Sequence, residues 1–593
     1  MLMFFDTEVY SNYFLALFKS ATGQVYRFEN KDSLKLIEFI KANKEATFVS
    51  FNGNGFDVPI LNAFIAGKTT AEIKAICDAI ITSGDSVYKV AKQFKISTQA
   101  PFDHIDIMEI PKGKLSLKLY GGRIHAPKLQ DLPIAPDAVI KPADLPLLRE
   151  YCLNDVETTE LLYRKLEPQI KLREIMSRQY GVDLRSKSDA QIAEAVIVSE
   201  LSFTPTKPKV TSKKFNYQSP EFIQFETSLF QSLLDEIREI EFSTSAKGEL
   251  LMPQNLTKKR IELNKSVYSM GLGGLHSCEK SRCWESNDEF QLIDADVTSF
   301  YPMVILRQRL SPKHLGNEFL TVYQSIVDKR IAAKAKKDMV TADTLKIVVN
   351  GSFGKFGSGY SNLYSPELLI QVTLSGQLSL FMLIERLEQN KIAVVSANTD
   401  GIVAYVPRNK IDLYNSILTL WELETGFDME TTLYDALYSQ SVNDYLALKP
   451  DGKIKGKGKF ADLSLDKNPK AFVCVEAVRN YILHGGSIEE SIMSCSDIRK
   501  FACVTVVNGG AIKDGEYLGK TIRWYYSTST LTAIHRNSDG SKIPDSTFAK
   551  PILQIPDSLP QDVNYPVYVN YAKKMLTNLG YNQERQPKQK ALL

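Results

Sequence analysis

The sequence predicts a multidomain chain of mixed α/β and α+β class. Its 593 residues are enough for roughly four domains or subdomains, each with a buried core. Short apolar runs typical of β-strands recur in both halves, as at 46–51 and 392–396. Stretches whose apolar residues have helical spacing lie between these runs. Strands separated by helices indicate sheets that are covered by helices, not an all-helical or all-strand chain.

Charge and cysteine content narrow the class of protein. The chain has 72 Lys and Arg against 69 Asp and Glu, so its net charge of +3 does not by itself indicate a nucleic-acid partner. Its seven cysteines have no framework spacing, which favours reduced thiols in a cytoplasmic compartment. Polar residues interrupt the apolar runs before these reach about eighteen residues, so we expect no membrane-spanning segment. The apolar start, Met1–Phe5, is typical of a first strand and not of a signal peptide.

Four acidic residues and a tyrosine stand out in the N-terminal part. Asp6 and Glu8 lie on one face of the first strand, because side chains alternate along a strand. A second strand ends in a glycine-rich turn that leads into Asp57. Tyr151 and Asp155 follow at i and i+4 on one face of a helical stretch. Each pattern alone is common as a turn or a surface pair, but together these side chains could converge.

Two further carboxylates stand at strand ends in the second half. Asp296 follows the apolar strand 290–295, and Asp400 lies in a turn between two apolar strands. Alone, each could be an ordinary acid beside a strand. Two carboxylates with nearby cations are what two-metal phosphoryl transfer requires, because hard oxygen ligands hold divalent ions while cations neutralise a triphosphate.

Cations that could bind a triphosphate lie between these two carboxylates. A helical stretch carries Arg330 and Lys334 one turn apart. After a turn, Thr341 is expected to cap a second helix, which places Lys346 and Asn350 on one face. A solvated charged face is the usual explanation for one such stripe, but two helices with facing cations could clamp a triphosphate.

With these residues the chain resembles the family B DNA polymerases of viruses and organellar plasmids. Asp296–Pro302, Lys346–Gly354 and Asn398–Gly401 resemble the family's motifs A, B and C. Tyr268–Gly274 resembles the linker that joins exonuclease and palm in that family. The acidic residues of the N-terminal part resemble the three motifs of the DEDD proofreading exonucleases. The resemblance covers most of residues 1–460.

The resemblance implies an RNase H-like exonuclease domain followed by a right-hand polymerase with palm, fingers and thumb. The expected parts are a 3′-5′ exonuclease domain at 1–165, a connecting helical region at 166–265, palm with motif A at 266–322, fingers with motif B at 323–357, palm with motif C at 358–464 and thumb at 465–593.

For the exonuclease, the resemblance implies a metal site for single-stranded 3′ ends. Asp6, Glu8 and Asp155 would hold metal. Asp57 would support the second ion, and Tyr151 would orient the attacking water. A basic wall would grip the strand, formed by Lys112, Lys114, Lys118, Arg123 and Lys128.

For the polymerase, the resemblance implies two Mg²⁺ ions, with Mn²⁺ as a possible substitute. Asp296 and Asp400 would coordinate both ions, with the carbonyl of Val297 as an additional ligand. Tyr301 would lie under the deoxyribose of the dNTP. Four residues would bind its triphosphate: Arg330, Lys334, Lys346 and Asn350.

Three positions depart from the family pattern. Asn398 stands where motif C has an aspartate. We expect Asp296 and Asp400 to suffice as ligands while Asn398 still offers a neutral oxygen, and we expect Asn398→Asp to be tolerated. In motif B, Gly351 and Phe353 replace the usual serine and tyrosine. Tyr445 is not preceded by the expected lysine two residues before it. We expect activity to be retained despite these changes.

These patterns predict a template-directed DNA polymerase of phage type with 3′-5′ proofreading, working in the host cytoplasm and away from membranes. Its partners would be primer-template DNA and dNTPs. The motifs are too closely spaced for the insertions of protein-primed members, so a separate processivity factor is expected. Two alternatives remain open. One is a 3′-5′ exonuclease with a decayed, DNA-holding polymerase domain, and the other is a non-catalytic scaffold.

Overall fold

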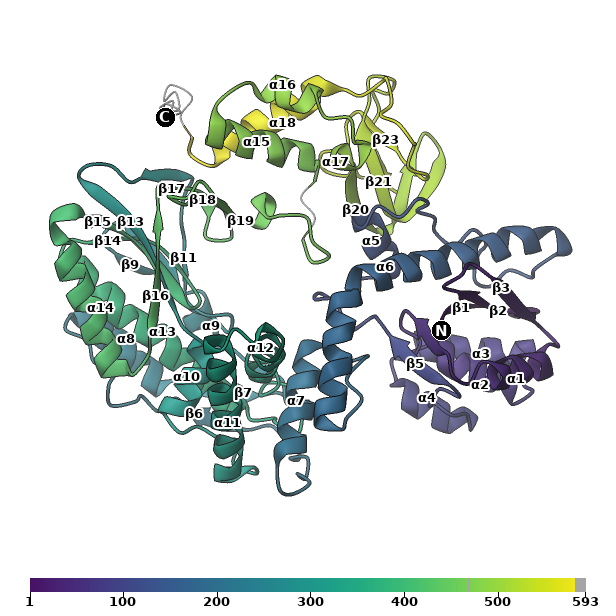
Figure 1. Cartoon of the computed structure of the whole chain (residues 1–593), viewed down its shortest axis with the longest axis horizontal. Helices are drawn as coiled ribbons and strands as arrows, with labels where there is room; N and C mark the ends of the chain where they lie inside the picture. The colour runs from purple at the N-terminus through teal and green to yellow at the C-terminus, as the bar shows by residue number, and fades with distance from the viewer. Residues whose placement is uncertain (468–469, 582–593) are drawn as a thin grey trace. The chain divides into compact units, whose positions relative to one another are not determined.

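The computed structural model describes residues 1–467 and 470–581, which form two compact units (Figure 1). Unit 1 comprises Met1–Ser177, Leu463–Cys474 and Glu489–Val569, and unit 2 contains Arg178–Asp462, Val475–Ile488 and the residues from Asn570 onward. The predicted mixed α/β, multidomain class is confirmed. The finer division into six parts stays a prediction, and the tail expected from Gln583 lies outside the described residues.

Unit 1 is built on a five-stranded sheet with the order β3-β2-β1-β4-β5. The strands are β1 (Leu2–Tyr10), β2 (Tyr13–Ser20), β3 (Val25–Glu29), β4 (Thr47–Ser50) and β5 (Asp103–Asp106). The central strand β1 pairs antiparallel with β2 and parallel with β4. The strand predicted at the start of the chain is therefore present and extends to Tyr10.

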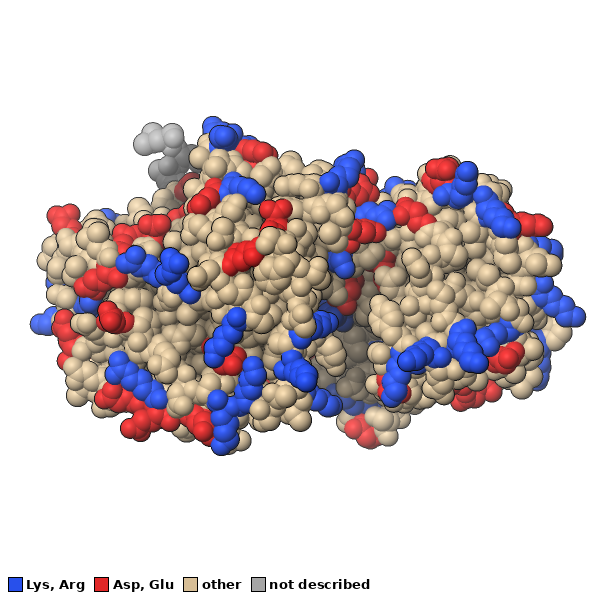
Figure 2. Space-filling model, turned by 90° about the horizontal axis from the view of Figure 1, so that it is seen from below, with Lys and Arg blue, Asp and Glu red and all other residues tan. Residues whose placement is uncertain are grey.

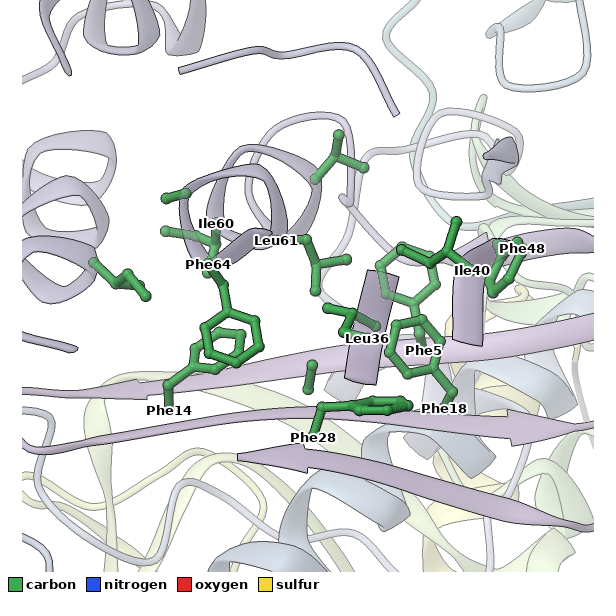
Figure 3. Packing of buried hydrophobic residues seen from close by; sticks show 14 of the residues in the cluster. Phe5, Phe14, Phe18, Phe28, Leu36, Ile40, Phe48, Ile60, Leu61 and Phe64 are labelled. Atoms are coloured by element: carbon green, nitrogen blue, oxygen red, sulfur yellow. The ribbon is translucent and has the colours of Figure 1, made fainter. Parts of the chain in front are cut away.

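One face of this sheet packs against a cluster of aromatic and aliphatic side chains (Figure 3). Phe5 and Phe18 stack with ring centroids 5.4 Å apart, and Phe48 meets Phe18 edge-on at 5.9 Å. Three short helices carry the covering residues: α1 (Ser33–Ala42), α2 (Asp57–Ile65) and α3 (Thr70–Thr82). A one-residue slip of β1 would exchange the side chains that face this cluster with those on the opposite face of the sheet, so the fit of the cluster depends on the register of β1.

The remaining helices of the N-terminal segment are α4 (Val87–Phe94), α5 (Leu117–Arg123) and α6 (Leu145–Tyr180). The helix predicted around Tyr151 begins earlier, at Leu145, and runs for 36 residues. Leu148, Cys152 and Val156 on α6 belong to a second apolar cluster with β1 and β2. This packing fixes the face of α6 that carries Tyr151.

The C-terminal part of unit 1 is a four-stranded sheet, with the order β22-β20-β21-β23, that packs on α5. The strands are β20 (Cys503–Lys513), β21 (Glu516–Tyr526), β22 (His535–Arg536) and β23 (Ala549–Pro551), followed by α18 (Tyr565–Asn578). Arg523 is only 2% exposed and donates to the carbonyl of Ala126 at 2.8 Å and of Leu553 at 3.2 Å. A buried guanidinium with several carbonyl partners holds two distant segments of the chain together.

Unit 2 contains a seven-stranded sheet with the order β16-β13-β15-β14-β11-β10-β9 and a four-stranded sheet with the order β12-β17-β18-β19. The strands of these two sheets are β9 (Ile261–Leu263), β10 (Ser266–Ser269), β11 (His276–Ser277), β12 (Arg282–Glu285), β13 (Phe290–Val297), β14 (Ala393–Asn398), β15 (Gly401–Pro407), β16 (Met429–Tyr434), β17 (Ala436–Ser441), β18 (Asp444–Leu448) and β19 (Ile454–Lys457). The hairpin predicted around Asp400 is formed by β14 and β15.

The helices of unit 2 that matter here are α7 (Asp189–Glu200), α8 (Ser228–Glu239), α10 (Phe300–Arg307), α11 (Gly316–Ala335), α12 (Met339–Phe353) and α13 (Pro366–Gln389). α7 begins with a capping box, in which Ser188 and Gln191 exchange hydrogen bonds. The predicted cap of α12 was wrong: Asp338 caps this helix by accepting from Thr341 N at 3.1 Å, so the helix starts three residues earlier.

The expectation that no segment is long and apolar enough to cross a membrane was wrong for α13. By length and composition it passes that test, but 83% of its most apolar window is buried inside the protein. Its sides pack on α10, α14 (Ile411–Thr425) and β14. A helix that is apolar all round and buried is typical of a protein core.

Acidic and basic side chains are intermixed on the face of the molecule drawn in Figure 2. This agrees with the small net charge of +3. Charged groups with a specific role must therefore be identified from their contacts.

Candidate active sites

The first site lies where β1 meets the start of α2. Asp6 and Glu8 flank Thr7 on β1, and Asp57 is the first residue of α2. Thr7 donates to Asp57 Oδ1 from its amide at 3.1 Å and from its hydroxyl at 2.6 Å. These two bonds use one oxygen of Asp57 and bring three carboxylates of β1 and α2 together, as the sequence predicted.

Helix α6 adds Asp155 and Tyr151 to the same site. Lys118 on α5 donates to Asp155 Oδ1, and its ammonium lies 4.3 Å from the centroid of the Tyr151 ring. Cys152 is buried within 4.8 Å of ligand atoms of Asp6 and Glu8. The structure thus gathers all five residues that the sequence singled out, with Lys118 as an additional cation.

Four carboxylates in one buried site repel one another. The pKa values of Asp6 and Glu8 are raised well above the usual range, chiefly by burial and then by neighbouring carboxylates, against the lowering effect of Lys118. Burial also raises the pKa of Asp57 to about 7 and that of Asp155 above its usual value. A divalent cation would relieve this repulsion, and carboxylates are the ligands it prefers, so the donor set fits Mg²⁺ or Mn²⁺.

The expected basic wall is largely occupied by contacts within unit 1. Lys118 pairs with Asp155, and Arg123 donates to the carbonyl of Leu465 at 2.6 Å. Lys114 pairs with Glu109 at 3.0 Å and Lys128 with Glu150 at 2.7 Å. The sequence pattern did not predict these partners, which are carboxylates for Lys114, Lys118 and Lys128 and a backbone carbonyl for Arg123.

The second site lies on the sheet of unit 2. Asp296 on β13 pairs in register with Gly401 on β15, directly after Asp400. Val297 donates its amide to the carbonyl of Asp400 at 2.7 Å. A Cβ at Gly401 would lie 2.1 Å from Asp296 Oδ1, so glycine is needed for the carboxylate to take this position. Together with Asn398, these carboxylates line a cavity of about 200 Å³.

Asn398 does not present a free side chain to this cavity. Its amide donates to the carbonyl of Val442 at 3.1 Å, and its oxygen accepts from the Thr399 hydroxyl at 3.2 Å. The side chain therefore ties the β14–β15 turn to the segment after β17. This contact argues against the expectation that Asn398→Asp is tolerated, because the amide donor would be lost.

A third carboxylate of this cavity was not identified from the sequence. Asp294 lies two residues before Asp296 and accepts from the Tyr434 hydroxyl and, at 3.1 Å, from Lys455 Nζ. Lys455 also donates to the Tyr434 hydroxyl at 3.1 Å. The alternation of Asp294 and Asp296 along β13 was the available signal. Lys455 also lines the cavity.

The buried environment of the cavity raises the pKa values of Asp296 and Asp400. Burial, and then the Asp294 charge, raise the pKa of Asp296 to about 6, while Lys455 opposes the rise. Burial raises the pKa of Asp400, and Lys457 and Lys455 oppose it. Two partly buried carboxylates side by side fit a divalent ion, as in the first site.

The cations predicted to bind a triphosphate lie on α11 and α12. Arg330 donates to the Ser299 hydroxyl at 2.6 Å, which links α11 to the segment after Asp296. Lys334 pairs with Glu430 on β16 at 3.2 Å. Lys346 and Asn350 lie one turn apart and are exposed on α12.

Tyr301 lies in the first turn of α10 and stacks on Phe353 of α12, with ring centroids 4.3 Å apart and an angle of 19°. Its hydroxyl is buried without a hydrogen-bond partner among the described residues. Phe353, a departure from the family pattern, thus fixes the plane of the Tyr301 ring.

Comparison with known proteins gives similarity to archaeal DNA polymerases. No family model matches the chain. DNA polymerase 1 of Aeropyrum pernix is 24% identical over 212 residues, which are 30% of this chain and 22% of that protein. DNA polymerase 1 of Sulfolobus acidocaldarius is 24% identical over 124 residues, 21% of this chain and 14% of that protein. The match therefore spans less than a quarter of either relative. The solved structure of the family B DNA polymerase from Pyrobaculum calidifontis has 16% identity and a TM-score of 0.40, covering 98% of this chain and 78% of that one.

Proposed function

We propose that this chain is a template-directed DNA polymerase of family B that also carries a separate 3′-5′ proofreading exonuclease site. The observation that carries the proposal is the pairing of Asp296 with the Asp400–Gly401 turn, beside helices that expose Lys346 and Asn350. Similarity to archaeal DNA polymerases supports the same reading.

In the polymerase site, Asp296, Asp400 and the carbonyl of Val297 would hold two Mg²⁺ ions, or Mn²⁺ in their place. These ions would supply the Lewis acidity that activates a primer 3′-hydroxyl and neutralises the departing pyrophosphate. Four side chains bind the triphosphate of the dNTP by charge and hydrogen bonds: Arg330, Lys334, Lys346 and Asn350. The Tyr301 ring, whose orientation is fixed by stacking on Phe353, excludes a ribose 2′-hydroxyl.

In the exonuclease site, Asp6, Glu8 and Asp155 would hold metal and Asp57 would support the second ion. Tyr151 orients the attacking water on the phosphodiester at a single-stranded 3′ end. Lys118 lies against Tyr151 and Asp155 of α6 and balances part of the negative charge of the site when no metal is bound.

The proposed setting is replication of a phage genome in the host cytoplasm, with primer-template DNA, dNTPs and a separate processivity factor as partners. One alternative has a specific observation in its favour. Asn398 replaces the aspartate that motif C normally has, so two carboxylates of the polymerase pattern remain, Asp296 and Asp400. A decayed polymerase half that only holds DNA beside an active 3′-5′ exonuclease would have this property.

Primer extension separates these functions. The purified protein is incubated with Mg²⁺ and a 5′-labelled primer on a longer template, with and without the four dNTPs. We expect extension with dNTPs and shortening without them. Shortening under both conditions would support the nuclease alternative, and no change in primer length under either condition would overturn both enzymatic assignments.

A further inference from the structure

Helix α7 lies beside the motif B helix α12, far from it in sequence but in the same unit (Figure 1). The sequence assigned no chemistry to α7, which follows the exonuclease segment. Its apolar face is buried, with Ile192, Ala193, Val196 and Ile197 on the inside. α12 in turn buries Leu345, Val348 and Val349 while it exposes Lys346 and Asn350.

The two helices approach each other closely at Gly351. A Cβ at this position would lie 2.5 Å from the carbonyl oxygen of Asp189 and 3.1 Å from the Cβ of Ala193. Real side chains do not approach a backbone carbonyl this closely, so any other residue would push α7 away from α12. This explains why glycine stands where the family pattern has serine.

A half-buried polar cluster fastens α7 to the chain that follows α12. Glu194 accepts from the amide of Asn362 at 2.6 Å and from its side chain at 3.0 Å. Its second oxygen pairs with Lys355 at 3.1 Å, and the two side chains are only 14% and 16% exposed. A partly buried pair with additional hydrogen bonds is held in one geometry, unlike an exposed ion pair.

α7 also touches α11, the other helix of the predicted triphosphate clamp. Glu200 at its end pairs with Lys329 at 3.7 Å. α11 and α12 are joined directly by Tyr323, whose hydroxyl donates to the carbonyl of Val349 at 3.2 Å. Each of the three helices therefore contacts the other two.

We propose that α7 is a third helix of the nucleotide-binding subdomain, and that it positions Lys346 and Asn350 by moving with α12 as one body when a dNTP binds. Gly351 and Glu194 are then positioning residues, because they act on the triphosphate only through α12. The inference rests on the proposed polymerase function and extends it to a segment outside the three motifs.

The first test compares two glycines of motif B. Gly354 has helical backbone angles and open space where a Cβ would be added, so Gly354→Ala is a matched control for Gly351→Ala. We expect Gly351→Ala to lower kcat/KM for dNTP about tenfold to a hundredfold, mainly through KM, because displaced binding groups lose their alignment. Gly354→Ala should stay within about twofold of wild type, and both variants should shorten primers at the wild-type rate. Equal kcat/KM in the two variants would contradict the inference.

A second variant tests the inference even if Gly351→Ala does not fold. Glu194→Gln keeps the acceptor oxygen and removes the charge, whereas Glu200→Gln changes a more exposed pair on the same helix. We expect Glu194→Gln to raise the KM for dNTP while the Kd for primer-template stays unchanged, and Glu200→Gln to alter neither. A wild-type KM in Glu194→Gln would overturn the positioning role of Glu194.

Hydrogen exchange measures the coupled motion directly. The exonuclease-silenced protein is bound to a dideoxy-terminated primer-template, and amide exchange is followed with and without the next correct dNTP and Mg²⁺. We expect protection of α12 and of α7 together in wild type, and loss of the α7 response in Gly351→Ala. Protection of α12 without α7 in wild type would overturn this inference alone. No response of α12 would instead overturn the proposed polymerase function.

Discussion

Neutralising Asp57 should stabilise the metal-free protein at alkaline pH while it removes a proposed metal-site carboxylate. Asp57 is 2% exposed, and its Oδ1 accepts both bonds from Thr7. Asp57→Asn keeps this acceptor and removes the charge. Any change in stability therefore reports the cost of the buried charge and not the loss of the Thr7 bonds.

The magnitude and the pH window follow from the pKa of Asp57, which burial raises to about 7 from 3.8. The folded protein keeps a proton there that the unfolded chain has released, so wild-type stability falls as the pH rises from about 4 to about 7. A shift of roughly three pKa units corresponds to a cost on the order of 4 kcal/mol above that window. We expect Asp57→Asn to recover most of this cost at pH 8 and almost none at pH 4.

Amide exchange of β1 and α2, in EDTA, gives the local opening free energy at each pH without assuming that the whole chain unfolds in one step. Asp137→Asn is the control, because Asp137 is a largely exposed carboxylate of the same unit. With Mg²⁺ at pH 8, wild type should gain protection and Asp57→Asn should gain less. The reasoning is refuted if Asp57→Asn has the same protection as wild type at both pH values in EDTA.

Three other substitutions test separate contacts. On an exonuclease-silenced background, Tyr301→Ala should reduce the ratio of kcat/KM for dCTP over CTP opposite template G by about tenfold or more, because the ring that excludes the ribose hydroxyl is gone. An unchanged ratio would show that Tyr301 does not exclude ribonucleotides. Asn398→Asp should lower the free energy of unfolding by about 1–3 kcal/mol in metal-free thermal or urea unfolding. The reason is that a carboxylate oxygen would replace the amide group that now donates to the Val442 carbonyl at 3.1 Å. An unchanged unfolding midpoint would contradict this. Arg523→Gln should lower the free energy of unfolding by about 3 kcal/mol or more, because buried carbonyls lose their donor. The C-terminal sheet of unit 1 should then become sensitive to limited proteolysis. Wild-type resistance to the protease would show that Arg523 does not hold these segments together.

Local patterns predicted the parts of both sites that depend on neighbours in sequence. Alternation along a strand placed Asp6 and Glu8 on one face, and the turn pattern identified the hairpin at Asp400. These features follow from backbone geometry within one strand or one tight turn.

Contacts between distant elements could not be predicted in the same way. Lys455 enters the cavity lined by Asp296 and Asp400 because β19 aligns with β18 and brings it to Asp294, a register that depends on the whole sheet. Lys118 reaches Asp155 only after α5 and α6 have packed on the same core. The contact of Gly351 with α7 depends on how two helices pack, which the apolar periodicity of either helix does not specify.

The central claim is that one chain carries two independent sites for phosphoryl chemistry, and reciprocal substitutions test it most directly. Asp6→Asn combined with Glu8→Gln, and separately Asp400→Asn, are compared with wild type in primer shortening and primer extension with Mg²⁺, after thermal unfolding has shown that each variant is folded. The account predicts that the first variant extends primers but no longer shortens them, and that the second shortens primers but no longer extends them. Loss of both activities in either folded variant would contradict it.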